Sequence, residues 1–336
     1  MKGFDTELTH LLNIKYPIIM APMFLINNVE MMIAAMNEGI AACIPAHNFR
    51  TDTDFRKALD AIRNRSRGCM GVNLIVNRSN LFYEEQLQTC LKYKMDFIIT
   101  SLGSPVKVIN ACKPLGIKVL TDVIDAPFAK KCESLGADAL IAVNNEAGGH
   151  LGPLPPKDLI QQLRQHCSLP VISAGGVGLG KHILEKLEWG ACGVSIGSPF
   201  IATTESPVSP EYKQACIDYG ANDIVVSTKI SGTPCTVINT PYVQKIGTKQ
   251  NWFEAILSRN KTVKKWIKML TFYKGMQSLE KAAFKATYKN VWVAGKTIEY
   301  TKEIMPVAVL IKKLIQEMEI ALDDKINPIF ESASAS

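Results

Sequence analysis

A histidine flanked by glycines is the feature of this sequence best placed to do chemistry. His150 follows Gly148 and Gly149, and Gly152 comes two residues later. Glycine lets the backbone approach a ligand that a side chain would keep away. An unperturbed imidazole titrates at about pH 6.5, so it can accept or release a proton near neutrality. The sequence predicts a proton-transfer site at His150, although a lone histidine in a turn is often only structural.

Two further glycine turns follow apolar runs and indicate a phosphate site. Gly175 and Gly176 end one predicted strand, and Gly197 and Ser198 end the next. Turns of this kind leave backbone N–H groups free to bind an anion, helped by the helix N-terminus behind them. In a (β/α)8 barrel the phosphate site lies in the loops after strands seven and eight. The two turns fall where those loops are expected.

Four polar residues near predicted strand ends are further candidates for contacts with a substrate or cofactor. Asn73 lies in an apolar strand, where its amide must find partners or cost a few kcal/mol. It either bonds the neighbouring strand or contacts a cofactor or substrate. Ser101 and Asp122 end the fourth and fifth predicted strands. They either line the opening at the carboxyl ends of the strands or cap the following helices. His47 follows the second strand and can face the same pocket.

Other motifs that would carry chemistry are missing from the sequence. It contains no HExxH, GxxxxGK[ST] or GxSxG pattern, so zinc proteolysis, P-loop chemistry and a hydrolase elbow are not supported. The nine cysteines form no CxxC pair and are interpreted as reduced thiols of a cytoplasmic protein, with no metal site. His166 and His182 fall on predicted helices and are interpreted as surface residues.

The elements that must position these residues alternate regularly over the first 200 residues. Short runs that are apolar on both faces, as buried parallel strands are, alternate with helical patterns. Eight such repeats predict a closed (β/α)8 TIM barrel. A doubly wound open sheet is the alternative, but it would carry GxGxxG where this chain has Ala21-Pro22-Met23. Strands are predicted at 17–21, 40–44, 70–75, 97–101, 118–122, 139–143, 171–174 and 193–197, with helices between them at 29–38, 53–63, 83–92, 105–113, 126–135, 156–165 and 181–189.

The last third of the chain has a different pattern. We expect the barrel to span 1–237, a C-terminal helical cap or substrate domain 238–330, and a frayed tail 331–336. Aromatic and basic residues with helical spacing occupy 249–289. Ile304–Leu322 is predicted to be an amphipathic helix with Glu317 and Glu319 on its far side. No linker-like stretch separates the parts, so a rigidly docked cap is expected.

The net charge of +7 lies entirely in that last third, because residues 238–336 hold 16 Lys and Arg against 9 Asp and Glu. Four lysines cluster around Trp266, at positions 261, 264, 265 and 268. A solvated helix face is the ordinary interpretation, and a docking surface for an acyl carrier or a CoA phosphate is the sharper one. Nucleic acid is not expected. No run of about 18 apolar residues indicates a membrane span, and no signal peptide is visible.

Taken together, the motifs resemble those of nitronate monooxygenases, formerly called 2-nitropropane dioxygenases. The resemblance covers about residues 15 to 240, with a looser echo at 292–296. Flavin-dependent enoyl-ACP reductases of bacterial fatty-acid synthesis look very similar. The matching segments are Ala21-Pro22-Met23, Gly71-Val72-Asn73-Leu74, Glu146-Ala147-Gly148-Gly149-His150-Leu151-Gly152, Ser173-Ala174-Gly175-Gly176-Val177 and Gly193-Val194-Ser195-Ile196-Gly197-Ser198-Pro199-Phe200, continued by Glu205-Ser206 and Tyr212-Lys213.

The resemblance implies non-covalent FMN, with its phosphate on the two glycine turns and its ring near the first and third strands. His150 would abstract a proton from a nitroalkane, and O2 would complete the reaction. An alternative function is an NAD(P)H-dependent reductase of enoyl thioesters or quinones. A third possibility is a non-catalytic flavin-binding protein. The implied cofactor-binding residues are Ala21, Pro22, Met23, Asn73, Ala147, Gly148, Gly149, Ser173, Gly175, Gly176, Ser195, Gly197 and Ser198.

Two departures from the family pattern bear on the substrate. The loop after the second strand is usually glycine-rich, but here it reads Ile44-Pro45-Ala46-His47-Asn48. The usual Gly-Thr-Arg-Phe after the eighth strand is here Gly197-Ser198-Pro199-Phe200, which removes a positive charge beside the phosphate turn. FMN binding should survive these changes, and the substrate range is what they alter.

Overall fold

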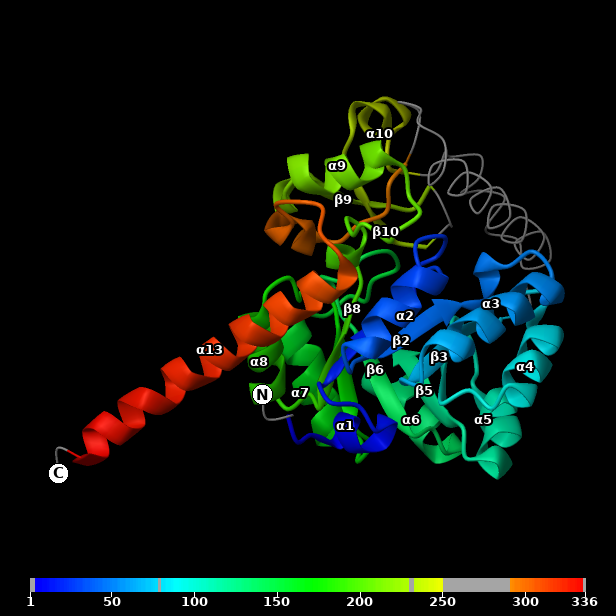
Figure 1. The fold of residues 1–336 in the computed structure, drawn as a ribbon, viewed down its shortest axis with the longest axis horizontal. Coiled ribbons are helices and arrows are strands. Elements are labelled where there is room, and N and C mark those ends of the chain that lie inside the picture. Colours follow the sequence, from blue (N-terminus) through cyan, green and yellow to red (C-terminus); the bar gives the residue numbers. More distant parts are fainter. Residues whose placement is uncertain (1–3, 78–79, 230–232, 250–290, 335–336) are drawn as a thin grey trace.

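A computed structural model describes residues 4–77, 80–229, 233–249 and 291–334. Eight parallel strands, β1 to β8, follow one another around a closed barrel (Figure 1). Ile19 of β1 pairs with Ala41 of β2 on one side and with Ser195 of β8 on the other, which closes the ring. The predicted TIM barrel is therefore confirmed, and the open sheet is excluded.

The strand and helix bounds agree with the predicted ranges to within two residues at each end. Short apolar runs made the strands visible because the barrel buries both of their faces. The strands are β1 Ile18–Met20, β2 Ala41–Pro45, β3 Met70–Ile75, β4 Phe97–Ser101, β5 Lys118–Val123, β6 Ala139–Val143, β7 Val171–Ala174 and β8 Gly193–Ile196. The helices between them are α2 Val29–Asn37, α3 Asp52–Arg65, α4 Tyr83–Lys92, α5 Val106–Cys112, α6 Ala126–Leu135, α7 Pro156–His166 and α8 Gly180–Glu188.

The amino end of the barrel is closed by a helix that the sequence pattern did not predict. Helix α1, Glu7–Leu12, begins with a capping box in which Thr6 and Thr9 bond each other's backbone. Its Leu8 and Leu12 are buried in one cluster with interior strand residues such as Phe97. The helix thus plugs the barrel at the end opposite the strand carboxyl ends.

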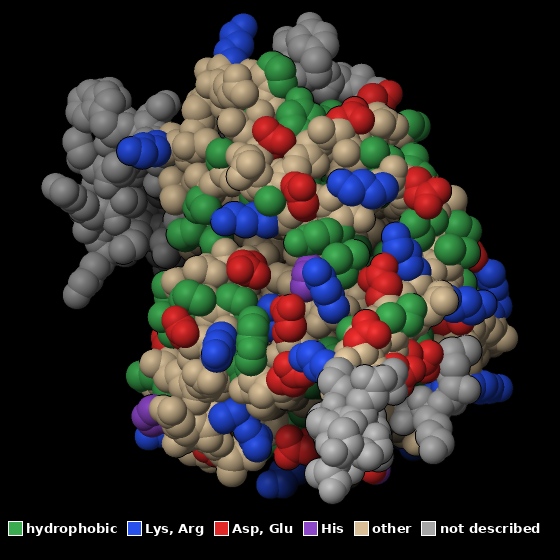
Figure 2. Space-filling view, turned by 90° about the vertical axis from the view of Figure 1, so that its left-hand side faces the viewer, with side chains coloured by type: hydrophobic (Ala, Val, Ile, Leu, Met, Phe, Trp, Pro, Cys, Tyr) green, Lys and Arg blue, Asp and Glu red, His purple; other side chains and the backbone are tan. Residues whose placement is uncertain are grey.

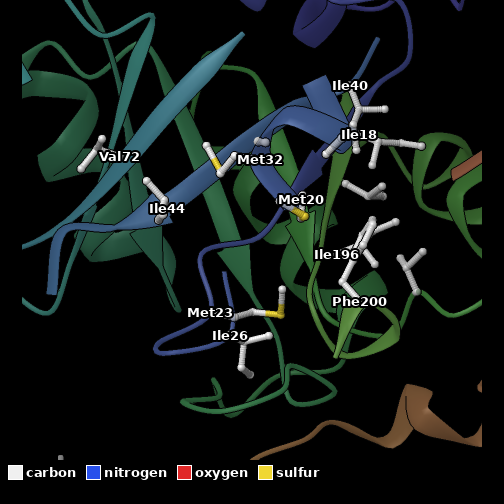
Figure 3. Packing of buried hydrophobic residues seen from close by; sticks show 14 of the residues in the cluster. Ile18, Met20, Met23, Ile26, Met32, Ile40, Ile44, Val72, Ile196 and Phe200 are labelled. Carbon is white, nitrogen blue, oxygen red and sulfur yellow. The ribbon is translucent and has the colours of Figure 1, made fainter. Parts of the chain in front are cut away.

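A second, larger core lies between the strands and the surrounding helices. Met20, Ile44 and Ile196 point outward from β1, β2 and β8 into this layer, where Met32 of α2 and Phe200 meet them (Figure 3). Successive strand residues point alternately inward and outward, so the apolar residues on both faces serve two separate cores.

Several described segments after β8 form a group above the carboxyl end of the barrel (Figure 1). It contains α9 Pro210–Asp218, α10 Pro241–Ile246 and an antiparallel hairpin of β9 Ile224–Ser227 with β10 Cys235–Ile238. This hairpin was not predicted. The proposed boundary at 237/238 falls inside β10, and residues 249–289 lie almost wholly outside the described residues, so the domain division stays a prediction.

The long helix α13, Val307–Ser334, runs beside α8 and α2 and continues away from the barrel (Figure 1). The predicted helix is present, but Glu317 is not on a far side. Its carboxylate accepts a hydrogen bond from the amide of Gly180, 2.7 Å away, at the start of α8. A negative charge there compensates the helix dipole. The backbone stays helical through Ser334, into the range expected to fray.

The cysteines fit the sequence-based expectation of buried, free thiols. On the face shown in Figure 2, Lys and Arg are interspersed with Asp and Glu. The lysine cluster around Trp266 lies outside the described residues. All nine cysteines are buried and free, and no group of described residues could hold a metal ion. Among the described helices, none has the length and apolar character needed to cross a membrane.

Candidate functional site

A cavity of about 870 Å³ opens at the carboxyl ends of the barrel strands. This volume lies within the range of cofactor and small-molecule sites, and the carboxyl end is where barrel enzymes place their chemistry. The structure brings together sixteen of the seventeen predicted site residues in its lining. They are Ala21, Pro22, Met23, His47, Asn73, Ser101, Asp122, Ala147, Gly148, Gly149, His150, Gly175, Gly176, Ser195, Gly197 and Ser198.

Ser173 is the predicted residue that does not reach the cavity. It lies in the middle of β7, is completely buried, and its hydroxyl has no hydrogen-bond partner in the described part of the chain. Its neighbours Ile172 and Ala174 belong with the interior of the barrel, so alternation turns Ser173 outward. A contact between this side chain and a ligand in the cavity is therefore not supported.

The two glycine turns stand side by side, because Ala174 of β7 pairs with Ser195 of β8. Gly175 and Gly176 have φ of +112° and +78°, which favour glycine. A Cβ on Gly175 would lie 2.5 Å from the backbone nitrogen of Ala147. Within the described residues, nothing accepts a hydrogen bond from the amides of these two glycines, nor from those of Gly197 and Ser198. Four such donors facing one cavity make an anion site.

The two glycine turns, Gly175-Gly176 and Gly197-Ser198, together form what we call the glycine corner. A third segment, distant in the sequence, completes it. The amide of Gly295 donates to the Ser198 hydroxyl at 2.8 Å, and Thr297 lines the cavity. Gly148 packs against both partners, since a Cβ there would lie 2.6 Å from the Ser198 Oγ. Gly148 therefore permits close packing of chain segments. The weak family resemblance at 292–296 indicated this segment in the sequence, but Thr297 was not among the predicted site residues.

His150 is held on the cavity wall by the unpredicted hairpin. The amide of Gly149 donates to the Thr236 hydroxyl at 2.9 Å, and the Thr236 amide donates back to the Gly149 carbonyl at 2.9 Å. His150 itself pairs with Cys235 of β10. Its exposed surface faces the cavity, whose walls desolvate the ring and lower the pKa of His150. A lowered pKa favours the neutral imidazole, which can act as a base.

The ends of β3, β4 and β5 carry a connected set of polar side chains. The Asn73 amide nitrogen donates to the Ile99 carbonyl at 3.1 Å and to the Ser101 hydroxyl at 2.7 Å. Ser101 in turn donates to Asp122 at 2.5 Å. Burial raises the pKa of Asp122 to about 6, and the bond from Ser101 opposes that rise. Helix capping by Asp122 is excluded, because Asp125 caps α6.

The remaining histidines separate into one at the cavity and three elsewhere, of which His10 lies on α1. His47 lines the cavity, and burial together with Arg50 lowers its pKa to about 4. His166 is exposed, as expected. His182 is not a simple surface residue: it is half-buried, its Nδ1 accepts from the amides at the start of α8, and its ring packs against Tyr300.

The cavity fits a flavin on the features of this chain alone. The glycine corner offers backbone donors for a phosphate, and Ala21, Pro22 and Met23 offer an apolar wall for a flat ring. Asn73 adds a side-chain amide whose nitrogen is already occupied, so its oxygen is left to accept a hydrogen bond. None of the described residues that line the cavity is a lysine or arginine.

Comparison with known proteins agrees with this site. Residues 75–317 match the family model described as nitronate monooxygenase. A probable nitronate monooxygenase of Staphylococcus haemolyticus is 28% identical over 286 residues, covering 72% of this chain and 80% of the relative. A (3aS,4S,5R,7aS)-5-hydroxy-7a-methyl-1-oxo-octahydro-1H-indene-4-carboxyl-CoA dehydrogenase of Rhodococcus jostii is 28% identical over 246 residues, covering 73% and 69%.

Two solved structures extend the similarity to nearly the whole chain. FabK from Thermotoga maritima superposes with a TM-score of 0.84 at 26% identity, covering 96% of this chain and 99% of that one. A nitroalkane oxidase from Streptomyces ansochromogenes gives a TM-score of 0.79 at 20% identity, covering 94% and 99%, and supports the fold.

The barrel and its glycine corner thus define a flavin-dependent oxidoreductase. The family model spans well over half of the sequence, and the chain belongs to the nitronate monooxygenase family.

Proposed function

We propose that this protein is an FMN-dependent oxidoreductase that oxidises nitroalkanes or their nitronates with O2, and that His150 is its base. The observation that carries the proposal is the position of His150, which lies on the wall of a cavity whose neighbouring corner has four backbone donors without a partner among the described residues. Free buried cysteines support a location in the cytoplasm.

The glycine corner would hold the FMN phosphate, using the amides of Gly175, Gly176, Gly197 and Ser198. Asn73 would accept a hydrogen bond from the ring, beside Ala21, Pro22 and Met23. Bound FMN would accept electrons from the substrate and pass them to O2. The protein's own contribution is to position the substrate and to move one proton.

His150 would remove the proton from the carbon beside the nitro group. That C–H is acidic, so one positioned base suffices. Desolvation by the cavity walls lowers the pKa of His150, which favours the neutral imidazole, and the hairpin fixes its backbone. Base catalysis should therefore persist down to a pH below the ordinary histidine pKa and be lost when the ring is protonated.

A second candidate is an NAD(P)H-dependent reductase of enoyl thioesters, carried by an acyl carrier or CoA, or of quinones. One similarity favours a thioester: the Rhodococcus jostii relative is named for a carboxyl-CoA substrate. The basic excess of the C-terminal third would suit such an acidic partner.

The two candidates are distinguished by mixing the flavin-loaded protein, without oxygen, with propyl nitronate and separately with NADH. If the nitronate alone bleaches the flavin, the first candidate stands. If NADH bleaches it rapidly and crotonyl-CoA restores the colour, the second replaces it.

Replacing His150 tests the base directly. We expect His150→Asn to keep its flavin and to lose nitroethane turnover about a hundredfold or more, the usual contribution of a general base. It should keep turnover of ethyl nitronate, which has no proton left to remove. His166→Asn, an exposed histidine away from the cavity, is the control. Equal loss with both substrates would remove the base from the mechanism.

A further inference from the structure

The cavity has a charge problem that His150 alone does not solve. Removing a proton from carbon leaves a negative charge on the substrate. Cations usually stabilise such a charge, but no lysine or arginine occurs among the described lining residues. Three carboxyl groups line the cavity instead, those of Asp122, Asp125 and Glu146. If all three were ionised, they would repel the anion that the reaction creates.

Asp122 is the carboxyl that is built to avoid this repulsion. One of its oxygens accepts from the Ser101 hydroxyl, while the other has no hydrogen-bond partner in the part of the chain that the structure describes. Its side chain is half-buried and lines the cavity. A carboxyl held this way can keep a proton on the open oxygen and donate it to a ligand.

We propose that the protonated carboxyl of Asp122 donates a hydrogen bond to the oxyanion that forms on the substrate when His150 removes a proton from carbon. The proposal rests on the function proposed above. In that step the C–H bond breaks, its proton goes to the imidazole, its electron pair forms the C=N bond, and the N=O π pair moves onto the nitro oxygens, which share the negative charge. No electron leaves the substrate, and Asp122 keeps its proton. The enolate oxygen of a thioester would present the same chemistry.

The surroundings of Asp122 agree with this role. Burial raises its pKa to about 6, so that about half of the carboxyl is protonated at pH 6 and about a tenth at pH 7 before any anion adds its own effect. The groups that face it are Ser101 on β4 and, inside the barrel, the Cys43 thiol, whose pKa burial and Asp122 raise. The other titratable cavity groups are His47, Asp125, Glu146, His150, Tyr212 and Cys235.

The test measures binding of propionate, an unreactive carboxylate shaped like ethyl nitronate, to the flavin-loaded protein between about pH 5.5 and 8.5 by the change in the flavin spectrum. For the wild type we expect a nearly constant Kd at the acidic end. The Kd should then rise about tenfold per pH unit once Asp122 loses its proton. No turnover is needed, so the result does not depend on the proposed reaction.

Three variants assign that pH dependence. Asp122→Asn keeps a donor at every pH, so its Kd should be flat and below the wild-type value at the alkaline end. Asp122→Leu should bind propionate about ten- to a hundredfold more weakly at acidic pH, having lost a hydrogen bond to a charge. Ser101→Ala should move the break to higher pH, because the bond from Ser101 lowers the pKa of Asp122.

His150 could produce a pH dependence of the same sign, since a protonated imidazole also attracts an anion. In His150→Asn the dependence should therefore persist if Asp122 causes it. A dependence that disappears in His150→Asn and survives in Asp122→Asn overturns the proposal. So does an Asp122→Asn variant that carries flavin but binds propionate as weakly as Asp122→Leu. Failure of the function proposed above would instead appear as undiminished nitroethane turnover by His150→Asn.

Discussion

The two ends of the barrel differ in the kind of side chains and backbone groups that they carry. At the amino end, Leu8 and Leu12 of α1 are buried against apolar strand residues and close the ring. At the carboxyl end, the same strands run into turns whose amides have no partner within the described residues, and into the linked side chains of Asn73, Ser101 and Asp122.

The residues that stabilise the fold and the residues that could do chemistry therefore lie at opposite ends of the barrel. Burial of apolar side chains stabilises the amino end, whereas the carboxyl end keeps polar groups that are open to a ligand or to water. Substitutions at the amino end should therefore change the free energy of unfolding and leave flavin binding alone. Substitutions at the carboxyl end should do the reverse.

The largest expected effect is that of Gly175→Ala. Its Cβ would be forced against the backbone of Ala147 at a positive φ, which distorts the phosphate turn. We expect bound flavin per folded chain to fall at least about tenfold, the loss that accompanies roughly 1.4 kcal/mol of binding free energy. The ratio of flavin absorbance to protein absorbance after purification measures it.

Gly116→Ala is the matched control for that variant. Gly116 precedes β5 at the amino end, has a φ of +70°, and has nothing within 4 Å of its Cβ position. It carries the same kind of backbone strain, about 1–2 kcal/mol, with no contact to the cavity. If Gly116→Ala lost flavin as Gly175→Ala does, strain rather than the turn's geometry would be responsible.

At the opposite end, Leu8→Ala should destabilise the barrel without disturbing the site. Leu8 is completely buried, and truncating a buried leucine costs about 2–5 kcal/mol. Chemical denaturation measures the change, with Leu115→Ala as the control, because Leu115 is exposed and should cost less than about 0.5 kcal/mol. A drop in flavin affinity of the folded Leu8→Ala protein would contradict the separation of the two ends.

The smallest expected effect is that of Glu317→Gln, which sharpens the boundary between the ends. Glu317 of α13 accepts from the first residue of α8, just after the phosphate turn. Removing its charge should lower the free energy of unfolding by about 0.5–1 kcal/mol and change flavin affinity by less than a factor of about three. Glu303→Gln, at an exposed position, is the control for both measurements.

Most of the barrel could be predicted from the sequence because its strands are apolar on both faces and its helices have a clear period. Helix α1 was missed since its six residues are too few to show that period. The hairpin of β9 and β10 was missed since each of its strands is only four residues long. Both contribute to function only through contacts with residues distant in the sequence, which no local pattern reveals.

The candidate site was predicted partly from residue types at strand ends and partly from the family resemblance, and the exceptions have physical reasons. Ser173 stands inside a matching motif, but strand alternation turns it away from the cavity. Thr297 enters the lining from a segment more than a hundred residues away from His150 in the sequence. The hydrogen bonds that link Asn73, Ser101 and Asp122 join three strands. They therefore depend on the register of the barrel, which cannot be determined from the sequence alone.

The most direct test of the central claim is the flavin content of the purified protein. The account predicts a yellow protein that releases one FMN per chain on denaturation and takes it up again after removal, with His150→Asn retaining the colour. A colourless protein that refuses FMN even at high concentration would contradict the glycine corner as a phosphate site and the chemistry built on it.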